Sequence, residues 1–168
     1  GQVCIAPTRL LVQDKVYKEF IDKFAESAKA LKVGNGLDAN STMGSLANPR
    51  RITAIESFVQ DAVAKGGKLE AGGHHVGNKG YFFEPTVISD TPKDSRAMNE
   101  EPFGPIASVR GFTSLDDAIA EANRLPYGLA GYTYTRSIGH LHQLSQRLEV
   151  GMLWVNQPAL PWPELPFG

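Results

Sequence analysis

Apolar residues in the first third of the chain recur at the period of an α-helix. A short apolar segment at residues 9–12 predicts a strand, and large side chains then follow at steps of three and four residues through 15–32. Asp14 precedes this helix in the position of an N-cap, and Gly34 follows it as a stop. The predicted apolar stripe is formed by Tyr17, Phe20, Ile21, Phe24, Ala28 and Leu31.

A second amphipathic helix is predicted from Pro49 to the glycine pair Gly66–Gly67, because proline fits the first turn of a helix. Its predicted buried face consists of Ile52, Ile55, Phe58, Val59, Ala62 and Val63. A strand is predicted at 68–71, a polar glycine-rich loop at 74–79, and a further strand at 81–88 that Pro85 interrupts.

The second half of the chain alternates between strand and helix patterns. Strands are predicted at 106–112, 129–135 and 152–156. Ser114 caps one intervening helix, with Asp117 in a capping-box position, and Ser137 caps another whose apolar positions start at Ile138. Short connections between alternating elements predict an α/β fold with a largely parallel central sheet.

Composition narrows the possible functions. The chain has 168 residues and a net charge of -1, from 17 basic and 18 acidic residues, so nothing favours nucleic acid or a charged membrane as a partner. No apolar run reaches the roughly 20 residues of a membrane span. A single cysteine cannot form an internal disulfide, which predicts a reducing, cytoplasmic location. The adjacent His74 and His75 point apart, so no metal site is expected.

Cys4 is the residue with the clearest chemical potential. A lone cysteine among apolar neighbours is often a small buried hydrophobe. The alternative is a thiolate nucleophile, which requires partial exposure and a lowered pKa. Composition and spacing leave both interpretations open.

Five segments, in order along the chain, resemble the NAD(P)-dependent aldehyde dehydrogenase superfamily. The first is Gly-Gln-Val-Cys at residues 1–4, followed by Arg9, which is similar to the active-site cysteine motif of that family. The others are the GYFFEPTV segment at 80–87, EEPFGP at 100–105, NRLPYGLAG at 123–131, and GMLWVN at 151–156 with PFG at 166–168. Together they cover essentially the whole chain.

The resemblance implies that residues 1–168 are a fragment of the three-layer, cysteine-bearing catalytic domain of an aldehyde dehydrogenase. The upstream domain that binds most of the NAD or NADP, and the C-terminal end of the parent chain, would then be absent. The general-base glutamate and an asparagine oxyanion donor also precede the cysteine in that family. We therefore expect this chain alone not to oxidise aldehydes, and the full-length protein to be a homo-oligomer.

The resemblance also implies roles for individual residues. Cys4 would attack the aldehyde carbonyl, and its backbone N–H would bind the oxyanion. Glu101 would hold ribose hydroxyls of the nicotinamide half of the cofactor, and Phe103 would pack against that half. Without the resemblance, Glu100 and Glu101 fit a solvated loop pair, and Phe103 fits ordinary core packing.

Four apolar residues are candidates for the aldehyde site. In the family, the segment after the Val-Asn pair forms one wall of the substrate funnel, so Leu160 and Trp162 would line its mouth, and Val3 and Ile5 would flank the nucleophile. Trp154 lies within a predicted strand and is expected to be core, and Tyr132 and Tyr134 are expected to pack on a strand face.

The residues are also compatible with two other classes of enzyme and with a non-catalytic module. A CoA-acylating semialdehyde dehydrogenase uses the same cysteine but passes the acyl group to CoA. A cysteine hydrolase would need a histidine near Cys4, and a non-catalytic module would keep the thiol buried.

Overall fold

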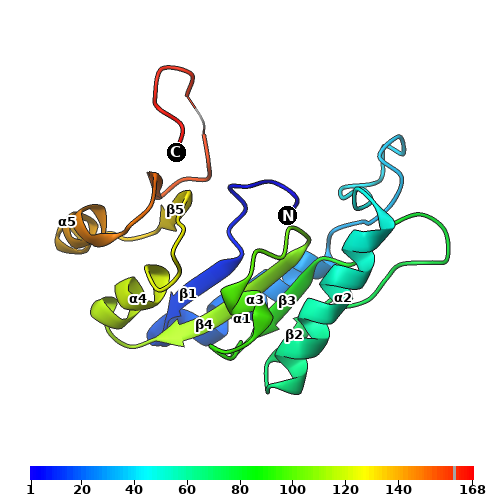
Figure 1. Cartoon of the computed structure of the whole chain (residues 1–168), viewed down its shortest axis with the longest axis horizontal. Coiled ribbons are helices and arrows are strands. Elements are labelled where there is room, and N and C mark those ends of the chain that lie inside the picture. The colour runs from blue at the N-terminus through cyan, green and yellow to red at the C-terminus, as the bar shows by residue number, and fades with distance from the viewer. Residues whose placement is uncertain (161) are drawn as a thin grey trace. The chain divides into compact units, whose positions relative to one another are not determined.

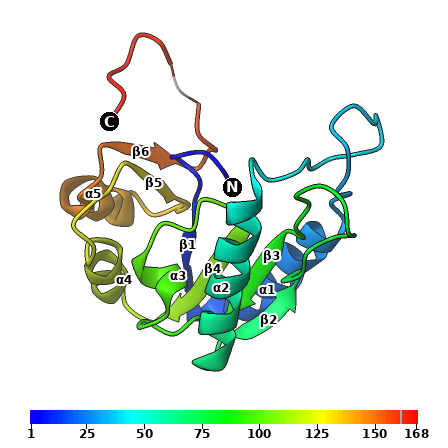
Figure 2. The same cartoon turned by 45° about the vertical axis from the view of Figure 1, so that its right-hand side comes forward.

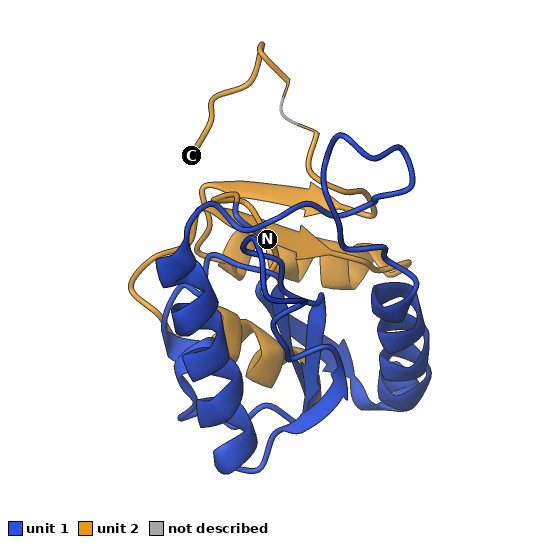
Figure 3. Cartoon of the chain, turned by 90° about the vertical axis from the view of Figure 1, so that its right-hand side faces the viewer, with its two compact units in different colours: residues 1–2, 8–111 blue, residues 3–7, 112–168 orange. Residues whose placement is uncertain are grey.

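The computed structural model describes residues 1–160 and 162–168 and divides the chain into two compact units. Unit 1 comprises Gly1–Gln2 and Thr8–Gly111, and unit 2 comprises Val3–Pro7 and Phe112–Gly168 (Figure 3). Each unit contains both helices and strands (Figure 1), and the predicted α/β class is confirmed. The predicted alternation holds from β3 onward, whereas α1 and α2, and β2 and β3, follow one another directly.

Unit 1 is built on a four-stranded sheet of order β1-β4-β3-β2. The strands are β1 (Arg9–Gln13), β2 (Lys68–Ala71), β3 (Thr86–Ser89) and β4 (Ile106–Phe112). β3 and β4 pair in parallel, whereas β2 pairs with β3 antiparallel at the edge. An antiparallel edge strand on an otherwise parallel sheet is common in α/β folds.

Helices α1 (Asp14–Lys29) and α2 (Pro49–Ala64) cover opposite faces of this sheet (Figure 2), and the short α3 (Arg96–Asn99) lies beside α2. Val87 and Ile88 are consecutive in β3 and therefore point to opposite faces. Val87 joins a cluster with residues of α1, and Ile88 joins a cluster with residues of α2. The α2-side cluster is Leu46, Ile55, Phe58, Val59, Ala62, Phe83, Ile88, Ala97 and Ile106.

Several local predictions for unit 1 were wrong. α1 begins at Asp14 itself, and its N-cap, Gln13, makes no side-chain capping bond. The carboxylate of Asp14 still lies in the first turn, where it complements the helix dipole. Leu31 and Val63 are each 42% exposed rather than buried, because α1 ends at Lys29 and Val63 lies off the face that α2 packs. Residues 81–83 make only an isolated bridge, His75 with Phe83, although Phe83 is fully buried.

Unit 2 contains α4 (Leu115–Ala122), β5 (Ala130–Thr133), α5 (Ile138–Arg147) and β6 (Met152–Val155). β5 and β6 form a separate parallel two-stranded sheet, with Tyr132 opposite Trp154. Both predicted caps are confirmed: Ser114 Oγ accepts from the N–H of Asp117 at 3.1 Å, and Ser137 Oγ accepts from the N–H of His140 at 3.2 Å.

The helix that Ser137 caps is confirmed, and Leu141, Leu144 and Leu148 are half-buried, but Ile138 does not share their burial. Ile138 is 85% exposed, and α5 buries none of its residues. Trp154 is buried, as predicted for a strand residue, whereas Tyr134 lies just beyond β5 and is 69% exposed. Among the described residues, no helix has both the length and the apolar character needed to cross a membrane.

Candidate active site

Cys4 lies in a hydrogen-bonded turn of unit 2. The N–H of Ala6 donates to the carbonyl of Val3 at 3.0 Å, which closes the turn around Cys4 and Ile5. The Cys4 side chain is exposed, so in this chain it does not act as a packed core residue. The Cys4 N–H makes no hydrogen bond within the described residues. A thiol and a backbone donor are therefore both available at the same residue.

The turn is attached to the two-stranded sheet through Tyr132. The Tyr132 hydroxyl donates to the carbonyl of Ile5 at 2.6 Å. Its ring stacks on Trp154, with the ring centroids 5.2 Å apart and the planes 16° apart. Burial raises the pKa of the Tyr132 phenol, and the nearby Tyr134 and Cys4 groups raise it further. The phenol therefore stays protonated at neutral pH and remains a donor.

The paired carboxylates that follow α3 differ in their surroundings. Glu100 forms two hydrogen bonds with the Arg96 guanidinium, at 2.8 and 2.9 Å, and these hold the pKa of Glu100 below its ordinary value. Arg96 is itself fixed over the ring of Phe58, 4.6 Å from the centroid. Glu101 is exposed and makes no hydrogen bond or ion pair within the described part of the chain. The pair is thus one structural carboxylate and one available carboxylate.

Phe103, two residues after Glu101, has a left-handed backbone conformation with φ 46°. This conformation is uncommon for a residue with a Cβ and is maintained only where the surroundings hold it. On one side, Arg51 Nη2 donates to the carbonyl of the buried Pro102. On the other, Gly104 packs so tightly that a Cβ there would lie 2.3 Å from Ile55 Cδ1. Residues of α2 therefore hold the turn that carries Glu101 and Phe103.

Near the start of α2, the buried atoms Asn48 Oδ1 and Arg51 Nε have no partner among the described residues. Buried polar atoms are nearly always hydrogen-bonded, so such atoms call for a partner such as water. The exposed carboxylate of Glu101 is a separate group, with two oxygens that can accept hydrogen bonds from hydroxyls. Glu101 therefore fits the predicted contact with the ribose in the nicotinamide half of NAD(P).

The cysteine motif and the EEPFGP motif meet within unit 1. A Cβ on Gly1 would lie only 2.0 Å from the carbonyl oxygen of Gly104, so the two backbones are in direct contact. The Gln2 side chain accepts from the N–H of Ala47 at 3.0 Å. Gly1 therefore contacts the turn that carries Glu101 and Phe103, and Gln2 is anchored on the segment that precedes α2.

The predicted substrate residues of the C-terminal segment belong to unit 2. Leu160 and Trp162 are 46% and 60% exposed, and Val3 is 50% exposed beside the nucleophile. This segment leaves β6 through Asn156, which has φ 55°. The Asn156 amide accepts from Thr135 N at 2.8 Å and donates to Thr135 O at 2.9 Å, so it fixes the direction in which the segment starts.

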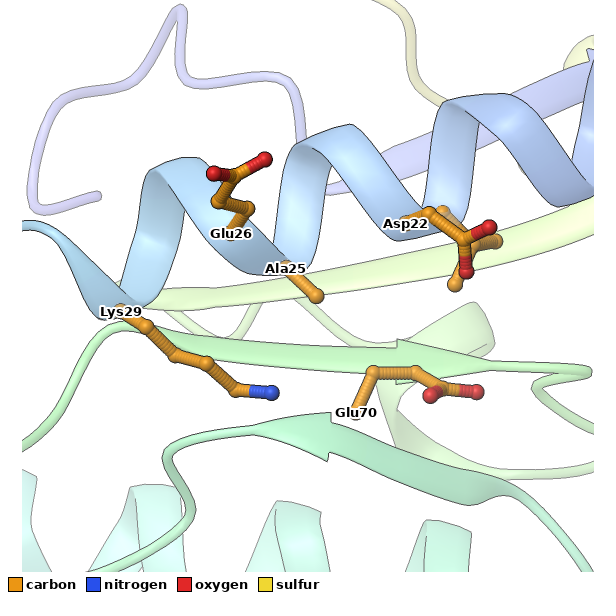
Figure 4. A pocket seen from close by; sticks show the side chains of 6 residues that line it. Asp22, Ala25, Glu26, Lys29 and Glu70 are labelled. Carbon is orange, nitrogen blue, oxygen red and sulfur yellow. The ribbon is translucent and has the colours of Figure 1, made fainter.

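The predicted site residues thus fall into two groups. One group lies in unit 2: a single turn contains Val3, Cys4 and Ile5, and the C-terminal segment of the same unit contains Leu160 and Trp162. The other group lies in unit 1, where one turn contains Glu101 and Phe103. A shallow hollow of about 380 Å³ lies elsewhere in unit 1, between α1 and β2 (Figure 4). It is lined by Ile21, Asp22, Ala25, Glu26, Lys29 and Glu70 and contains none of the candidate residues.

Sequence reasoning missed three residues that shape these groups: Tyr132, Asn156 and Arg51. Asn156 was part of a recognised motif, but no sequence signal indicated that its amide would bind Thr135. The partner of Tyr132 is 127 positions away along the chain, and that of Arg51 is 51 away. Within the described residues, no group of three or more histidine, cysteine, aspartate or glutamate side chains could hold a metal ion.

Comparison with known proteins identifies the family. The family model described as the aldehyde dehydrogenase family matches residues 1–168. Over the whole chain, 46% of residues are identical to the putative 4-(hydroxymethyl)benzenesulfonate dehydrogenase TsaD2 of Comamonas testosteroni. A probable NADP⁺ succinate-semialdehyde dehydrogenase of Sinorhizobium fredii is 40% identical over 168 residues, all of this chain and 34% of that protein.

A solved structure gives the same result. The betaine aldehyde dehydrogenase of Staphylococcus aureus, determined with NAD⁺ and a BME-modified cysteine, matches 99% of this chain with a TM-score of 0.93 and 35% identity. The chain therefore belongs to the aldehyde dehydrogenase family, an oxidoreductase family, and has its fold. It spans 35% of the length of the Comamonas relative and 34% of the Staphylococcus structure.

Proposed function

We propose that the full-length protein carrying this chain oxidises an aldehyde to a carboxylic acid with NAD or NADP, and that Cys4 is the nucleophile. The observation that carries this proposal is the exposed Cys4 thiol in a hydrogen-bonded turn of a chain that belongs to this family. Residues 1–168 would form part of its catalytic domain.

The chemistry assigned to this chain centres on Cys4. The thiolate forms a bond between sulfur and the aldehyde carbon, and the carbonyl oxygen becomes an oxyanion that accepts a hydrogen bond from the Cys4 N–H. NAD(P), when bound, supplies the acceptor for the hydride that leaves this carbon. Water then attacks the resulting thioester and loses one proton to the general base of the full-length protein, and the S–C bond breaks to release the acid and return the thiolate to Cys4.

Replacing the nucleophile tests this proposal. Cys4→Ser in the full-length protein should abolish aldehyde-dependent NAD(P)H formation, because a neutral hydroxyl is a far weaker nucleophile at pH 7. Turnover close to that of the wild type would refute the proposal. Adding CoA to the wild-type reaction distinguishes the CoA-acylating alternative, which would yield an acyl-CoA instead of the free acid.

Glu101 and Phe103 are proposed to hold the nicotinamide half of the cofactor, most of which the remainder of the protein would bind. The support is the exposed carboxylate of Glu101, which makes no hydrogen bond or ion pair among the described residues, on a turn that Arg51 holds through the Pro102 carbonyl. In the full-length protein, Glu101→Gln should slow hydride transfer by up to about 100-fold, since a displacement of ~1 Å can have that effect. The initial burst of NAD(P)H measures this step, and an unchanged burst would leave Glu101 as a solvated loop residue.

The proposed substrate is an aldehyde that bears an anionic group. Of the three relatives described above, the two with the higher identities, 46% and 40%, are named for a benzenesulfonate and for succinate semialdehyde, which are anions at neutral pH. The third, at 35% identity, is named for betaine aldehyde, which is a cation. Val3, Ile5, Leu160 and Trp162 would contact its apolar part. We expect kcat/KM to be higher for succinate semialdehyde and 4-sulfobenzaldehyde than for butanal and benzaldehyde. A preference for the neutral aldehydes would contradict this substrate class.

Three further properties of the protein are part of the proposal. The chain alone should give no NAD(P)H with an aldehyde, because the family's base and most of its cofactor site lie in other segments. The full-length protein should be a homo-oligomer, as the resemblance to the family implies, and light scattering can test this. We expect the protein to be cytoplasmic, because a reactive thiol stays reduced there. The localisation of a tagged full-length protein tests this expectation.

A further inference from the structure

One peptide group in the Cys4 turn is hydrogen-bonded at both ends. The Ile5 carbonyl accepts from the Tyr132 hydroxyl at 2.6 Å, and the N–H of the same peptide group, on Ala6, donates to the Val3 carbonyl at 3.0 Å. Hydrogen bonds in such a chain polarise and strengthen one another. The phenol on β5 is thus linked, through one peptide group, to the bond that closes the turn around Cys4.

The donor in this chain of hydrogen bonds has little freedom to move. Tyr132 pairs with Trp154 in the β5–β6 register, and the two rings stack. Trp154 is only 7% exposed, so it provides a fixed surface for the Tyr132 ring. A donor held by a strand and a buried ring can hold its acceptor in one position.

We propose that Tyr132 is a positioning residue for the nucleophile: its hydroxyl fixes the Val3–Ala6 turn in the conformation that presents the thiol and the N–H of Cys4. This inference rests on the proposed role of Cys4. Raising the pKa of the phenol, as burial and its neighbours do, keeps the hydroxyl protonated over the pH range in which a cysteine thiolate forms.

The test uses the full-length protein with the substitutions Tyr132→Phe and Tyr134→Phe. The first removes only the oxygen that binds Ile5 and keeps the stacked ring. The second removes the hydroxyl of an exposed tyrosine two residues away and serves as the matched control. Both variants are compared in kcat, in KM for NAD(P), in the rate of Cys4 alkylation by iodoacetamide without cofactor, and in Tm.

We expect kcat to fall at least about 10-fold in Tyr132→Phe, since misplacing a reacting atom by ~1 Å can slow a reaction about 100-fold. KM for NAD(P) should stay unchanged, and the alkylation rate should differ from that of the wild type by at least about threefold. The control should stay within about twofold of the wild type in both rates. A purely structural role would lower Tm without this separation of kcat from KM.

Two outcomes would overturn the inference. One is a kcat and an alkylation rate for Tyr132→Phe within about twofold of the wild type, and the other is an equal loss in both tyrosine variants. Cys4→Ser, measured in parallel, separates this inference from the proposed function: an active Cys4→Ser refutes the role of Cys4 itself. If Tyr132→Phe unfolds, Trp154→Phe replaces it, and unchanged rates in that variant would overturn the inference.

Discussion

The two units of this chain are stabilised in different ways. Unit 1 places α1 and α2 on the two faces of one sheet, and both hydrophobic clusters found among the described residues belong to it. In unit 2, α5 buries no residue, and the large side chains of Ile138, Tyr134 and Phe167 are 60–85% exposed. Similar sequence patterns have therefore produced two hydrophobic clusters in unit 1, whereas in unit 2 they include a helix, α5, with no fully buried residue.

The difference is relevant to the candidate site. The proposed cofactor turn, with Glu101 and Phe103, is held by residues of the packed α2. The nucleophile turn is held instead by a few specific contacts, chiefly the Tyr132 hydrogen bond and the Trp154 stack. We expect substitutions in the core of unit 1 to act mainly on stability, and those around the Cys4 turn mainly on the geometry of the nucleophile.

The largest expected effect is on the core of unit 1. Phe83 is completely buried, so Phe83→Ala should lower the free energy of unfolding of the chain by about 3–5 kcal/mol. Ile138 is 85% exposed, so Ile138→Ala should change it by no more than about 0.5 kcal/mol. Urea unfolding followed by circular dichroism measures both, and similar losses would contradict the contrast between the units.

Two glycines, one in each unit, differ in the space available for an added methyl group. Gly104→Ala should destabilise the chain by about 1–3 kcal/mol, because the new Cβ would lie 2.3 Å from Ile55 Cδ1 in the core. Gly139 lies in α5, and a Cβ there meets nothing nearer than Ser137 Oγ at 3.7 Å. Gly139→Ala should therefore stabilise the chain by about 0.5–1 kcal/mol through helix propensity. If thermal unfolding shows that both substitutions stabilise the chain, or that both destabilise it, the prediction is wrong.

The smallest expected effect concerns the two adjacent carboxylates of unit 1. Glu100→Gln removes the Arg96 pair, but both groups are largely solvated, so the loss at pH 7 should be under about 1 kcal/mol. Because the pKa of Glu100 is lowered in the folded chain, the pair contributes above the ordinary pKa of 4.5 and less as pH falls below it. The difference from the wild type should therefore shrink below pH 4.5 in urea unfolding.

Glu101→Gln is the control for that measurement. Glu101 is exposed and makes no ion pair among the described residues, so its substitution should leave the stability of the chain unchanged across the same pH range. A loss as large as that of Glu100→Gln would show that the two carboxylates share one structural role.

Local sequence patterns predicted much of the fold correctly. The strand at 106–112 and the strand at 68–71 match the observed β4 and β2, and the helix after Pro49 matches α2. The caps at Ser114 and Ser137 were also correct. These features depend on residues that lie within a few positions of each other, so the pattern contains the information that determines them.

Sequence patterns could not separate Glu100 from Glu101. The difference arises because Arg96, one turn earlier on the short α3, donates hydrogen bonds to Glu100. The Arg96 guanidinium is itself held over the ring of Phe58 in α2. α3 has only four residues and no clear apolar period, so it was not predicted. The left-handed Phe103 likewise depends on Arg51 and Ile55, which α2 brings to the turn.

By itself, then, the sequence determined the α/β class, most element positions and, through five motifs, the aldehyde dehydrogenase family, because each follows from short-range patterns. Tertiary structure determined that Ile138 of α5 stays exposed, that Glu100 rather than Glu101 pairs with Arg96, and that the Tyr132 hydroxyl donates to the Ile5 carbonyl from 127 positions away. The physical reason is that burial and side-chain partners are set by which elements pack together, and periodicity along one element does not contain that information.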